Sequence, residues 1–340
     1  MSPAVPAVPA AVPVPAATRR IRSADGTWLH AELHGPEGAP MVVLAHGWTC
    51  STLFWAPVVR RLAADHRVVA YDQRGHGGSD LPPTAAGFST EKLADDLQAV
   101  LTELVPAGER AVLAGHSMGG MTIMAAGDRP EVAARTAAAV LISTGPADLV
   151  AELLVVPPAV RGRGPRRLLH RQILESRLPL GPVTRVSKAL LKYATMGPQA
   201  APEQVDACAA VVHACPTVTR RRWARVLGEL DVTAGLAALR APTAVVVGTH
   251  DKLTPPVHAR RIAAALADPR GLLELPGVGH MSPVERPDEV AAEIRRLVGL
   301  RTGEAGTAAA QPAQRPTAQP AQQPTDQSAA QPVARRSEAV

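Results

Sequence analysis

Short runs that are wholly or almost wholly apolar recur along the chain, at residues 41–45, 67–71, 111–114, 138–142 and 243–247. A run without polar alternation is typical of a strand buried on both faces, as the strands of a parallel sheet are. The stretch 90–104 has the spacing of a helix instead, because its apolar residues recur every three or four positions behind a Ser or Thr cap. The sequence therefore predicts an α/β fold, with a mostly parallel central sheet flanked by helices.

Weaker patterns extend the sheet toward both ends of the chain. Asp25 and Gly26 separate two short alternating stretches and predict a hairpin turn that opens the sheet. Residues 272–275 are the candidate for the last strand, and the stretches 257–266 and 288–298 predict the late helices.

Composition divides the chain into a core, an insert and two terminal segments. The core is expected over 18–145 and 241–300, which contain the strand and helix patterns. The insert, 146–240, is basic and helical in pattern, and it falls between two strands, where an α/β sheet accepts a lid above its C-terminal edge. Residues 1–17, rich in Pro and Ala, and 301–340, rich in Ala, Gln and Pro, are expected to be a disordered leader and a disordered tail.

Composition also excludes several classes of protein. No apolar run approaches the roughly 18 residues of a transmembrane helix, and the first 17 residues lack the basic and apolar regions of a signal peptide. The chain has three cysteines, Cys50, Cys208 and Cys215, so at least one stays unpaired in any disulfide scheme, and their spacing is not that of metal ligands. We therefore expect buried thiols and a cytoplasmic location. Aromatic residues make up 2% of the chain and no nucleic-acid-binding motif is present, so nucleic acid is not an expected partner.

The positive charge is concentrated in the insert. Residues 146–240 contain 14 Lys and Arg against 7 Asp and Glu, a net charge of +7, whereas the whole chain carries +6. Two clusters contribute most of it: Arg161, Arg163, Arg166, Arg167 and Arg171, then Arg220, Arg221, Arg222 and Arg225. These clusters either attract an anionic carrier or a lipid surface, or form a solvated face without a partner.

The strongest motif in the sequence is Gly115-His116-Ser117-Met118-Gly119. It directly follows the apolar run 111–114 and opens a helical stretch. A G-x-S-x-G at a strand-to-helix turn is typical of a nucleophilic serine, because the sharp turn exposes the hydroxyl and small neighbours relieve crowding around it. We therefore predict that Ser117 is a nucleophile.

Two residues late in the chain complete a catalytic set with this serine. A serine hydroxyl needs a base, and the base needs a group that fixes its tautomer. His280 and Asp251 lie in loops that each follow a predicted strand, where the sites of α/β sheets assemble. The chain order predicts His280 as the general base and Asp251 as the carboxylate that orients it. Asp148, after the run 138–142, is the alternative acid.

Acyl transfer also needs backbone N–H groups that face the developing oxyanion. One donor is expected to be the N–H of Met118, which directly follows the nucleophile. The other is expected to be the N–H of Trp48, in the segment His46-Gly47-Trp48 that follows the run 41–45. The Trp48 indole either lines the pocket or packs beneath the insert.

Taken together, the motifs resemble those of the α/β-hydrolase superfamily over residues 20–300. The resemblance rests on His46-Gly47-Trp48, Tyr71-Asp72-Gln73-Arg74-Gly75-His76-Gly77-Gly78-Ser79, Gly115-His116-Ser117-Met118-Gly119, Gly248-Thr249-His250-Asp251 and Gly279-His280. It implies an α/β-hydrolase fold in which His76 supports the loops beneath the site. The chain differs from dehalogenases and epoxide hydrolases of this superfamily, which have a carboxylate where this chain has Ser117. The stretch around Trp48 is similar to cofactor-free haloperoxidases and perhydrolases.

The activity predicted from these residues is cleavage of a small carboxylic ester or thioester through an acyl-enzyme on Ser117, with His280 transferring the proton. This chemistry requires neither a metal ion nor an organic cofactor. Two alternatives remain open. One is other triad chemistry, such as peracid formation, a lyase step or C–C cleavage, and the other is ligand binding without turnover.

Overall fold

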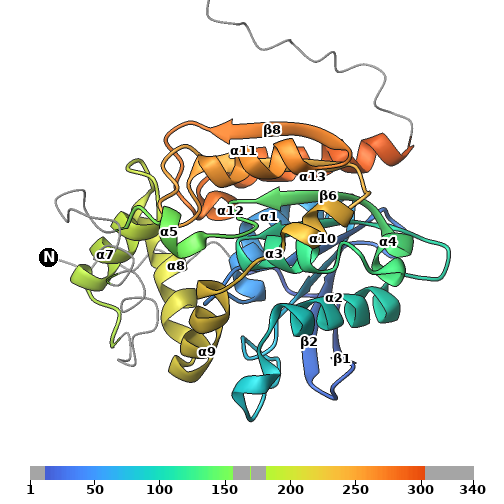
Figure 1. Cartoon of the computed structure of the whole chain (residues 1–340), viewed down its shortest axis with the longest axis horizontal. Helices are drawn as coiled ribbons and strands as arrows, with labels where there is room; N and C mark the ends of the chain where they lie inside the picture. The colour runs from blue at the N-terminus through green and yellow to red at the C-terminus, as the bar shows by residue number, and fades with distance from the viewer. Residues whose placement is uncertain (1–11, 156–168, 170–180, 303–340) are drawn as a thin grey trace, which may run out of the picture. The chain divides into compact units, whose positions relative to one another are not determined.

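The computed structural model describes residues 12–155, 169 and 181–302. These residues form one sheet of eight strands in the order β1-β2-β4-β3-β5-β6-β7-β8 (Figure 1). The strands are β1 (Ala17–Arg22), β2 (Trp28–His34), β3 (Met41–Ala45), β4 (Arg67–Tyr71), β5 (Ala111–His116), β6 (Thr136–Ile142), β7 (Thr243–Gly248) and β8 (Pro269–Leu275). β2 pairs antiparallel with β1 and β4, and all other neighbours are parallel, which confirms the predicted sheet.

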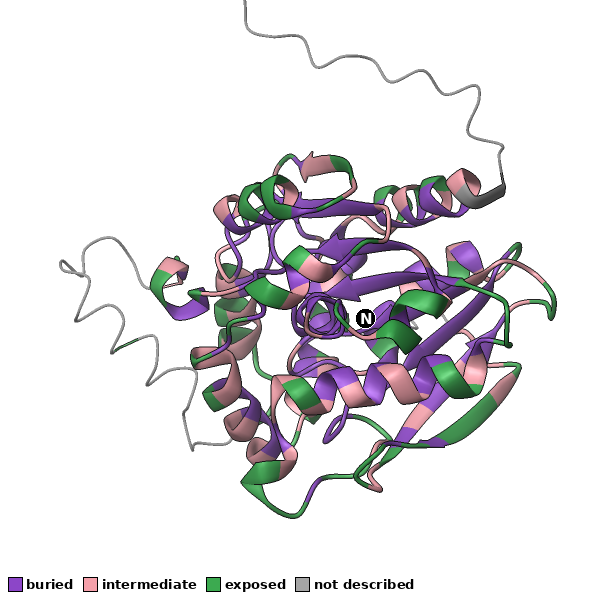
Figure 2. Cartoon of the chain, turned by 45° about the vertical axis from the view of Figure 1, so that its right-hand side comes forward, coloured by how far each residue is buried: buried purple, intermediate pink, exposed green. Residues whose placement is uncertain are grey.

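Successive residues of the central strands point to opposite faces of the sheet. Val43 and Leu113 belong to the apolar cluster on one face, whereas Val42 and Val112 belong to the cluster on the other. Figure 2 shows that the central strands are buried along most of their length. These strands are apolar throughout because both of their faces are covered.

Helices cover each face of the sheet. The apolar cluster on one face includes residues of α1 (Ala56–Leu62), α12 (Ser282–Glu285) and α13 (Pro287–Thr302). The cluster on the other face includes residues of α2 (Thr90–Leu104), α3 (Met118–Ala125), α4 (Pro130–Arg135) and α11 (Pro256–Ala265). Two short 3-10 helices, η1 (Thr52–Trp55) and η2 (Ala85–Gly87), lie in the connections. α2 begins as the sequence predicts, because the Ser89 side chain accepts the N–H of Lys92 at 3.2 Å.

The bounds of most predicted elements agree with the structure to within two residues, and the turn at Asp25 and Gly26 joins β1 to β2 as expected. Two elements differ by more: β8 begins three residues earlier than predicted, and α13 ends four residues later. The first residues of β8, Pro269, Arg270 and Gly271, are exposed and lack large apolar side chains, so hydrophobicity does not mark them. β1 includes Ala17 of the predicted leader, and α13 continues to Thr302 in the predicted tail. Residues 1–11 and 303–340 lie outside the described residues.

The described part of the predicted insert is helical. It contains α5 (Leu149–Glu152), α7 (Arg185–Thr195), α8 (Pro202–Ala214), α9 (Thr217–Gly228) and α10 (Thr233–Ala238). In Figure 1, α5, α7, α8 and α9 gather beyond one end of the sheet. None of the described helices is both long enough and apolar enough to cross a bilayer.

The structure describes only the second of the two Arg clusters in the insert. The first cluster, Arg161 to Arg171, lies outside the described residues. In the second, Arg220 is buried, and the Arg222 guanidinium donates to the carbonyls of Pro82 and Pro83 at 2.6 and 3.0 Å. Part of the second cluster therefore makes internal contacts that hold α9 against the core.

Candidate active site

Ser117 lies at the turn between β5 and α3. Its φ of 51° is in the left-handed region, which residues with a side chain rarely adopt and which costs about 1–3 kcal/mol. The surrounding structure holds this conformation, because the Ser117 N–H donates to the carbonyl of Ile142 at 2.9 Å and its carbonyl accepts the Thr144 hydroxyl at 2.7 Å. The turn therefore has the strained geometry predicted for the nucleophile motif, and it holds Ser117 in a buried position.

The glycines of the motif are required by close contacts around this turn. A Cβ at Gly115 would lie 2.4 Å from the carbonyl oxygen of Gly119, and a Cβ at Gly119 would lie 2.0 Å from that of Ala45. Backbone atoms cannot move away from such contacts without shifting a strand. The small residues therefore allow α3 to start directly against β3 and β5.

The structure brings His280 and Asp251 together. Nδ1 of His280 lies 2.8 Å from Oδ2 of Asp251, and both side chains are buried. Oδ1 of Asp251 accepts the N–H groups of Leu253 and Thr254, both at 2.9 Å, so the carboxylate is fixed by its own loop. When Nδ1 donates to Asp251, Nε2 is the nitrogen that accepts a proton. The alternative acid, Asp148, instead lies at the N-cap of α5.

The loop that carries His280 is held next to the Ser117 turn. The ring of His280 lies 4.9 Å, centroid to centroid, from the ring of His116, the residue before Ser117. Nε2 of His116 donates to the carbonyl of His280 at 2.9 Å, and the N–H of His280 donates to the carbonyl of Thr195, at the end of α7, at 2.7 Å. The insert is therefore in direct contact with the predicted base.

Glu285 lies under the same loop. Its buried carboxylate accepts the N–H of Gly197 at 2.7 Å and that of Gly279 at 3.1 Å. Burial raises the pKa of Glu285, and these two N–H donors oppose that rise. The sequence indicates no role for Glu285 or Thr195, because neither lies in a recognisable motif.

The segment His46-Gly47-Trp48 lies against the Ser117 turn. A Cβ at Gly47 would be 3.1 Å from Cβ of Ser117. Nε2 of His46 accepts the N–H of Gln73 at 3.0 Å, and Nε2 of His76 accepts the N–H of Thr49 at 3.3 Å. Burial lowers the pKa of His46 to about 3 and that of His76 to about 4, so both rings are neutral acceptors. His76 thus supports the loop, in keeping with the role that the resemblance implies.

The two predicted oxyanion donors face no competing acceptor. Met118 is the first residue of α3, so its N–H has no partner within the helix. Among the described residues, neither this N–H nor that of Trp48 donates to a protein acceptor. The Trp48 indole donates to the carbonyl of Arg220 at 3.1 Å, so it packs against α9.

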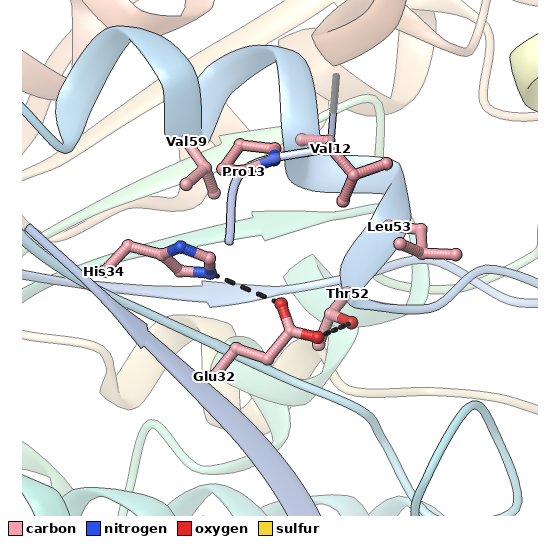
Figure 3. Close-up of a pocket in the computed structure, with 8 residues that line it drawn as sticks. Val12, Pro13, Glu32, His34, Thr52, Leu53 and Val59 are labelled. Atoms are coloured by element: carbon pink, nitrogen blue, oxygen red, sulfur yellow. Dashed lines mark hydrogen bonds and ion pairs between the residues drawn. The ribbon is translucent and has the colours of Figure 1, made fainter. Parts of the chain in front are cut away.

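The other kinds of site to consider among the described residues are a metal site and a ligand pocket. Within the described ranges, no group of three or more His, Cys, Asp and Glu side chains is arranged to hold a metal ion. A small pocket lies between the N-terminal segment, β2 and the start of α1, where Val12 and Pro13 lie over Glu32 and His34 (Figure 3). No residue that lines it belongs to the predicted catalytic set.

Comparisons with known proteins agree with this fold. A model described as the Alpha/beta hydrolase family matches residues 42–293. A Variovorax paradoxus protein named "Putative carbamate hydrolase RutD" is 32% identical over 263 residues, which is 75% of this chain and 90% of that protein. Epoxide hydrolase A of Mycobacterium tuberculosis is 28% identical and matches 84% of this chain and 98% of its own length. The structure of a thermophilic esterase from Thermogutta terrifontis, 24% identical, superposes with a TM-score of 0.66 over 84% of this chain and 99% of that one.

Proposed function

The chain belongs to the α/β-hydrolase family, and we propose that it is a serine hydrolase that cleaves carboxylic esters or thioesters through an acyl-enzyme on Ser117. The observation that carries the proposal is the 2.8 Å contact between His280 and Asp251, in a loop that is held against the strained Ser117 turn. The fold alone would not support it, because one fold hosts many reactions.

The proposed cycle uses only side chains and backbone groups of this chain. His280 Nε2 takes the hydroxyl proton as Oγ of Ser117 attacks the acyl carbon, and the N–H groups of Met118 and Trp48 stabilise the oxyanion. His280 then gives this proton to the leaving alcohol or thiol, and the acyl-enzyme remains. Water attacks the acyl-enzyme while His280 removes its proton, and His280 then returns this proton to Oγ of Ser117 as the carboxylic acid is released. Asp251 stays ionised and stabilises the imidazolium in both halves of the cycle.

The residue at position 117 favours acyl chemistry over epoxide opening. A carboxylate that opens an epoxide forms an ester, which water can cleave again, whereas Ser117 would form a stable ether. A carbamate, by contrast, presents a carbonyl that the same cycle can attack. We therefore include carbamates in the substrate panel, as the name of the 32% identical relative suggests.

A labelling experiment tests the proposal. The wild type and Ser117→Ala are treated with a fluorophosphonate probe, and both are assayed with p-nitrophenyl esters, acyl thioesters and carbamates of graded chain length. We expect the wild type to be labelled and to turn over at least one class, and Ser117→Ala to lose both properties. Ser187→Ala, which changes a half-buried serine in the first turn of α7, outside the predicted catalytic set, is the matched control and should still be labelled.

Three outcomes would contradict the proposal. Labelling without turnover of any acyl substrate would favour the other triad reactions, which are then sought as peracid, lyase or C–C cleavage products. A folded wild type that is neither labelled nor active would favour ligand binding without turnover. Equal labelling of the wild type and Ser117→Ala would show that the nucleophile lies elsewhere.

A further inference from the structure

His116 is buried at the centre of the candidate site and contacts three of its parts. It precedes Ser117 in the chain, and its ring lies 4.9 Å from that of His280. A Cβ at Gly47, in the predicted oxyanion loop, would lie only 2.7 Å from Nδ1 of His116. The ring of Phe54 stacks on it at 4.5 Å with an angle of 33°. This imidazole therefore has one orientation, set by packing on several sides.

The hydrogen bond of His116 fixes its tautomer. Nε2 lies 2.9 Å from the carbonyl oxygen of His280, and a carbonyl can only accept, so Nε2 carries the hydrogen. Within the described residues, Nδ1 is buried without a hydrogen-bond partner. Burial, together with the neighbouring His280, lowers the pKa of His116 well below its ordinary value. His116 is thus a neutral imidazole that donates from Nε2.

The main chain of His280 is held on both sides. Its N–H donates to Thr195 at 2.7 Å, and its carbonyl accepts from His116 at 2.9 Å. Asp251 holds the side chain at Nδ1, which leaves Nε2 for the proton transfer. Of these three contacts, only the one from His116 comes from a residue bonded directly to Ser117, so it links the base to the nucleophile.

We propose that His116 is a positioning residue that sets the distance between Nε2 of His280 and Oγ of Ser117 by donating a hydrogen bond to the His280 carbonyl. The inference rests on the proposed function and names a further residue for that reaction. Its neutral ring also suits this place, since a second positive charge beside His280 would oppose formation of the imidazolium during acyl transfer.

Two substitutions separate the hydrogen bond from packing. His116→Leu fills much of the same space without a donor, whereas His116→Gln can present a side-chain N–H near the place of Nε2. We expect His116→Leu to lower kcat by about 10- to 100-fold with KM changed less than about threefold, because misplaced catalytic groups cost rates of this order. His116→Gln should recover most of kcat. His213→Gln, a change at a histidine on α8 outside the site, is the control for the loss of an imidazole.

A second readout does not depend on turnover. The proton between Nδ1 of His280 and Asp251 gives a downfield NMR signal when the loop is ordered, and it is recorded for the wild type and both variants. We expect this signal to broaden or shift in His116→Leu and to stay at the wild-type position in His116→Gln. If His116→Leu does not fold, His116→Asn, whose amide is too short to reach the carbonyl, replaces it in the comparison with Gln.

The outcomes distinguish this inference from the proposed function. A wild type that shows no turnover contradicts the proposed function, while the NMR comparison still tests whether His116 orders the His280 loop. Wild-type kcat and an unchanged Nδ1 signal in folded His116→Leu would overturn the inference. Equal impairment of the Gln and Leu variants would also overturn it, because packing rather than the hydrogen bond would then be the cause.

Discussion

Thr254 donates its hydroxyl hydrogen to Oδ2 of Asp251 at 2.9 Å, the same oxygen that lies 2.8 Å from Nδ1 of His280. The hydroxyl oxygen of Thr254 is itself 3.3 Å from this Nδ1. Two donors therefore meet at one carboxylate oxygen, and the position of that oxygen sets the orientation of the imidazole. The sequence gives no sign of this arrangement, because Thr254 lies in a loop outside the motifs.

Replacing Thr254 with Val should weaken this arrangement while keeping a β-branched side chain of similar size. Because a hydrogen bond to a charged group is worth about 1.5–3 kcal/mol, we expect the free energy of unfolding to fall by about this amount. We also expect kcat to fall, since Oδ2 of Asp251 would lose one of the two donors that set its position. Urea unfolding and steady-state kinetics measure the two effects. Thr254→Ser keeps the hydroxyl and should retain most of both properties; equal losses in the two variants would contradict a role for the hydrogen bond.

Much of the site could be predicted because its residues follow apolar strands. Ser117 and Asp251 lie just beyond the buried strands β5 and β7, and His280 follows the partly exposed β8; a parallel sheet brings the C-terminal ends of its strands to one edge. The contact between Thr195 and His280 could not be predicted in this way. It joins two segments far apart in sequence, and it depends on how the insert packs, which no local pattern encodes.

A side chain at Gly119 should prevent the Ser117 turn from forming. In Gly119→Ala the new Cβ would lie 2.0 Å from the carbonyl oxygen of Ala45, which is part of β3 and cannot move freely. We expect a loss of about 3 kcal/mol or more in the free energy of unfolding, at the upper end of overpacking costs, and loss of fluorophosphonate labelling. Thermal unfolding and labelling measure this.

Gly228→Ala is the matched control for the change at Gly119. The nearest atom to a Cβ at Gly228, the last residue of α9, is 4.0 Å away. Alanine is favoured over glycine in a helix, so this variant should be as stable as the wild type or slightly more stable. A Gly119→Ala protein with wild-type stability and labelling would show that β3 yields at low cost.

The buried Arg74 should be important for stability rather than for chemistry. Its guanidinium lies 2.6 Å from Asp96 and 2.8 Å from Asp25, and it donates to the carbonyl of Gly87 at 2.9 Å. Arg74→Ala would leave Asp96 buried without its partner, which costs about 3–5 kcal/mol. Arg74→Lys should recover only part of this, because an ammonium group cannot form the two-pronged contact.

Urea unfolding of these variants tests the prediction, with Arg260→Ala as the control. Arg260 forms an exposed ion pair with Glu274, so its loss should leave the free energy of unfolding close to the wild-type value. An Arg74→Ala protein that unfolds at the wild-type urea concentration would contradict the importance of the buried pair.

Acid should destabilise the protein partly through Glu32 on β2. Its carboxylate lies 3.5 Å from His30 Nε2. It also lies 3.3 Å from His34 Nε2 and accepts the hydroxyl of Thr52 at 3.1 Å, two contacts that Figure 3 shows. These hydrogen bonds, with those from the two histidines the largest, lower the pKa of Glu32 from its ordinary 4.5 to about 2. The ionised form is therefore favoured more in the folded chain than in the unfolded one.

The direction of the pH dependence follows from this lowered pKa. Above pH 4.5 the carboxylate is ionised in both states and its full contribution to stability is present; as the pH falls from 4.5 toward 2, the unfolded chain takes up the proton first and that contribution is lost. Urea unfolding of the wild type and Glu32→Gln at several pH values measures it. The wild type should lose stability more steeply with acid than Glu32→Gln does, whereas Glu37→Gln, which changes a carboxylate exposed to solvent, should keep the wild-type slope. Identical slopes for the wild type and Glu32→Gln would mean that the contacts from His30, His34 and Thr52 favour both protonation states of Glu32 equally.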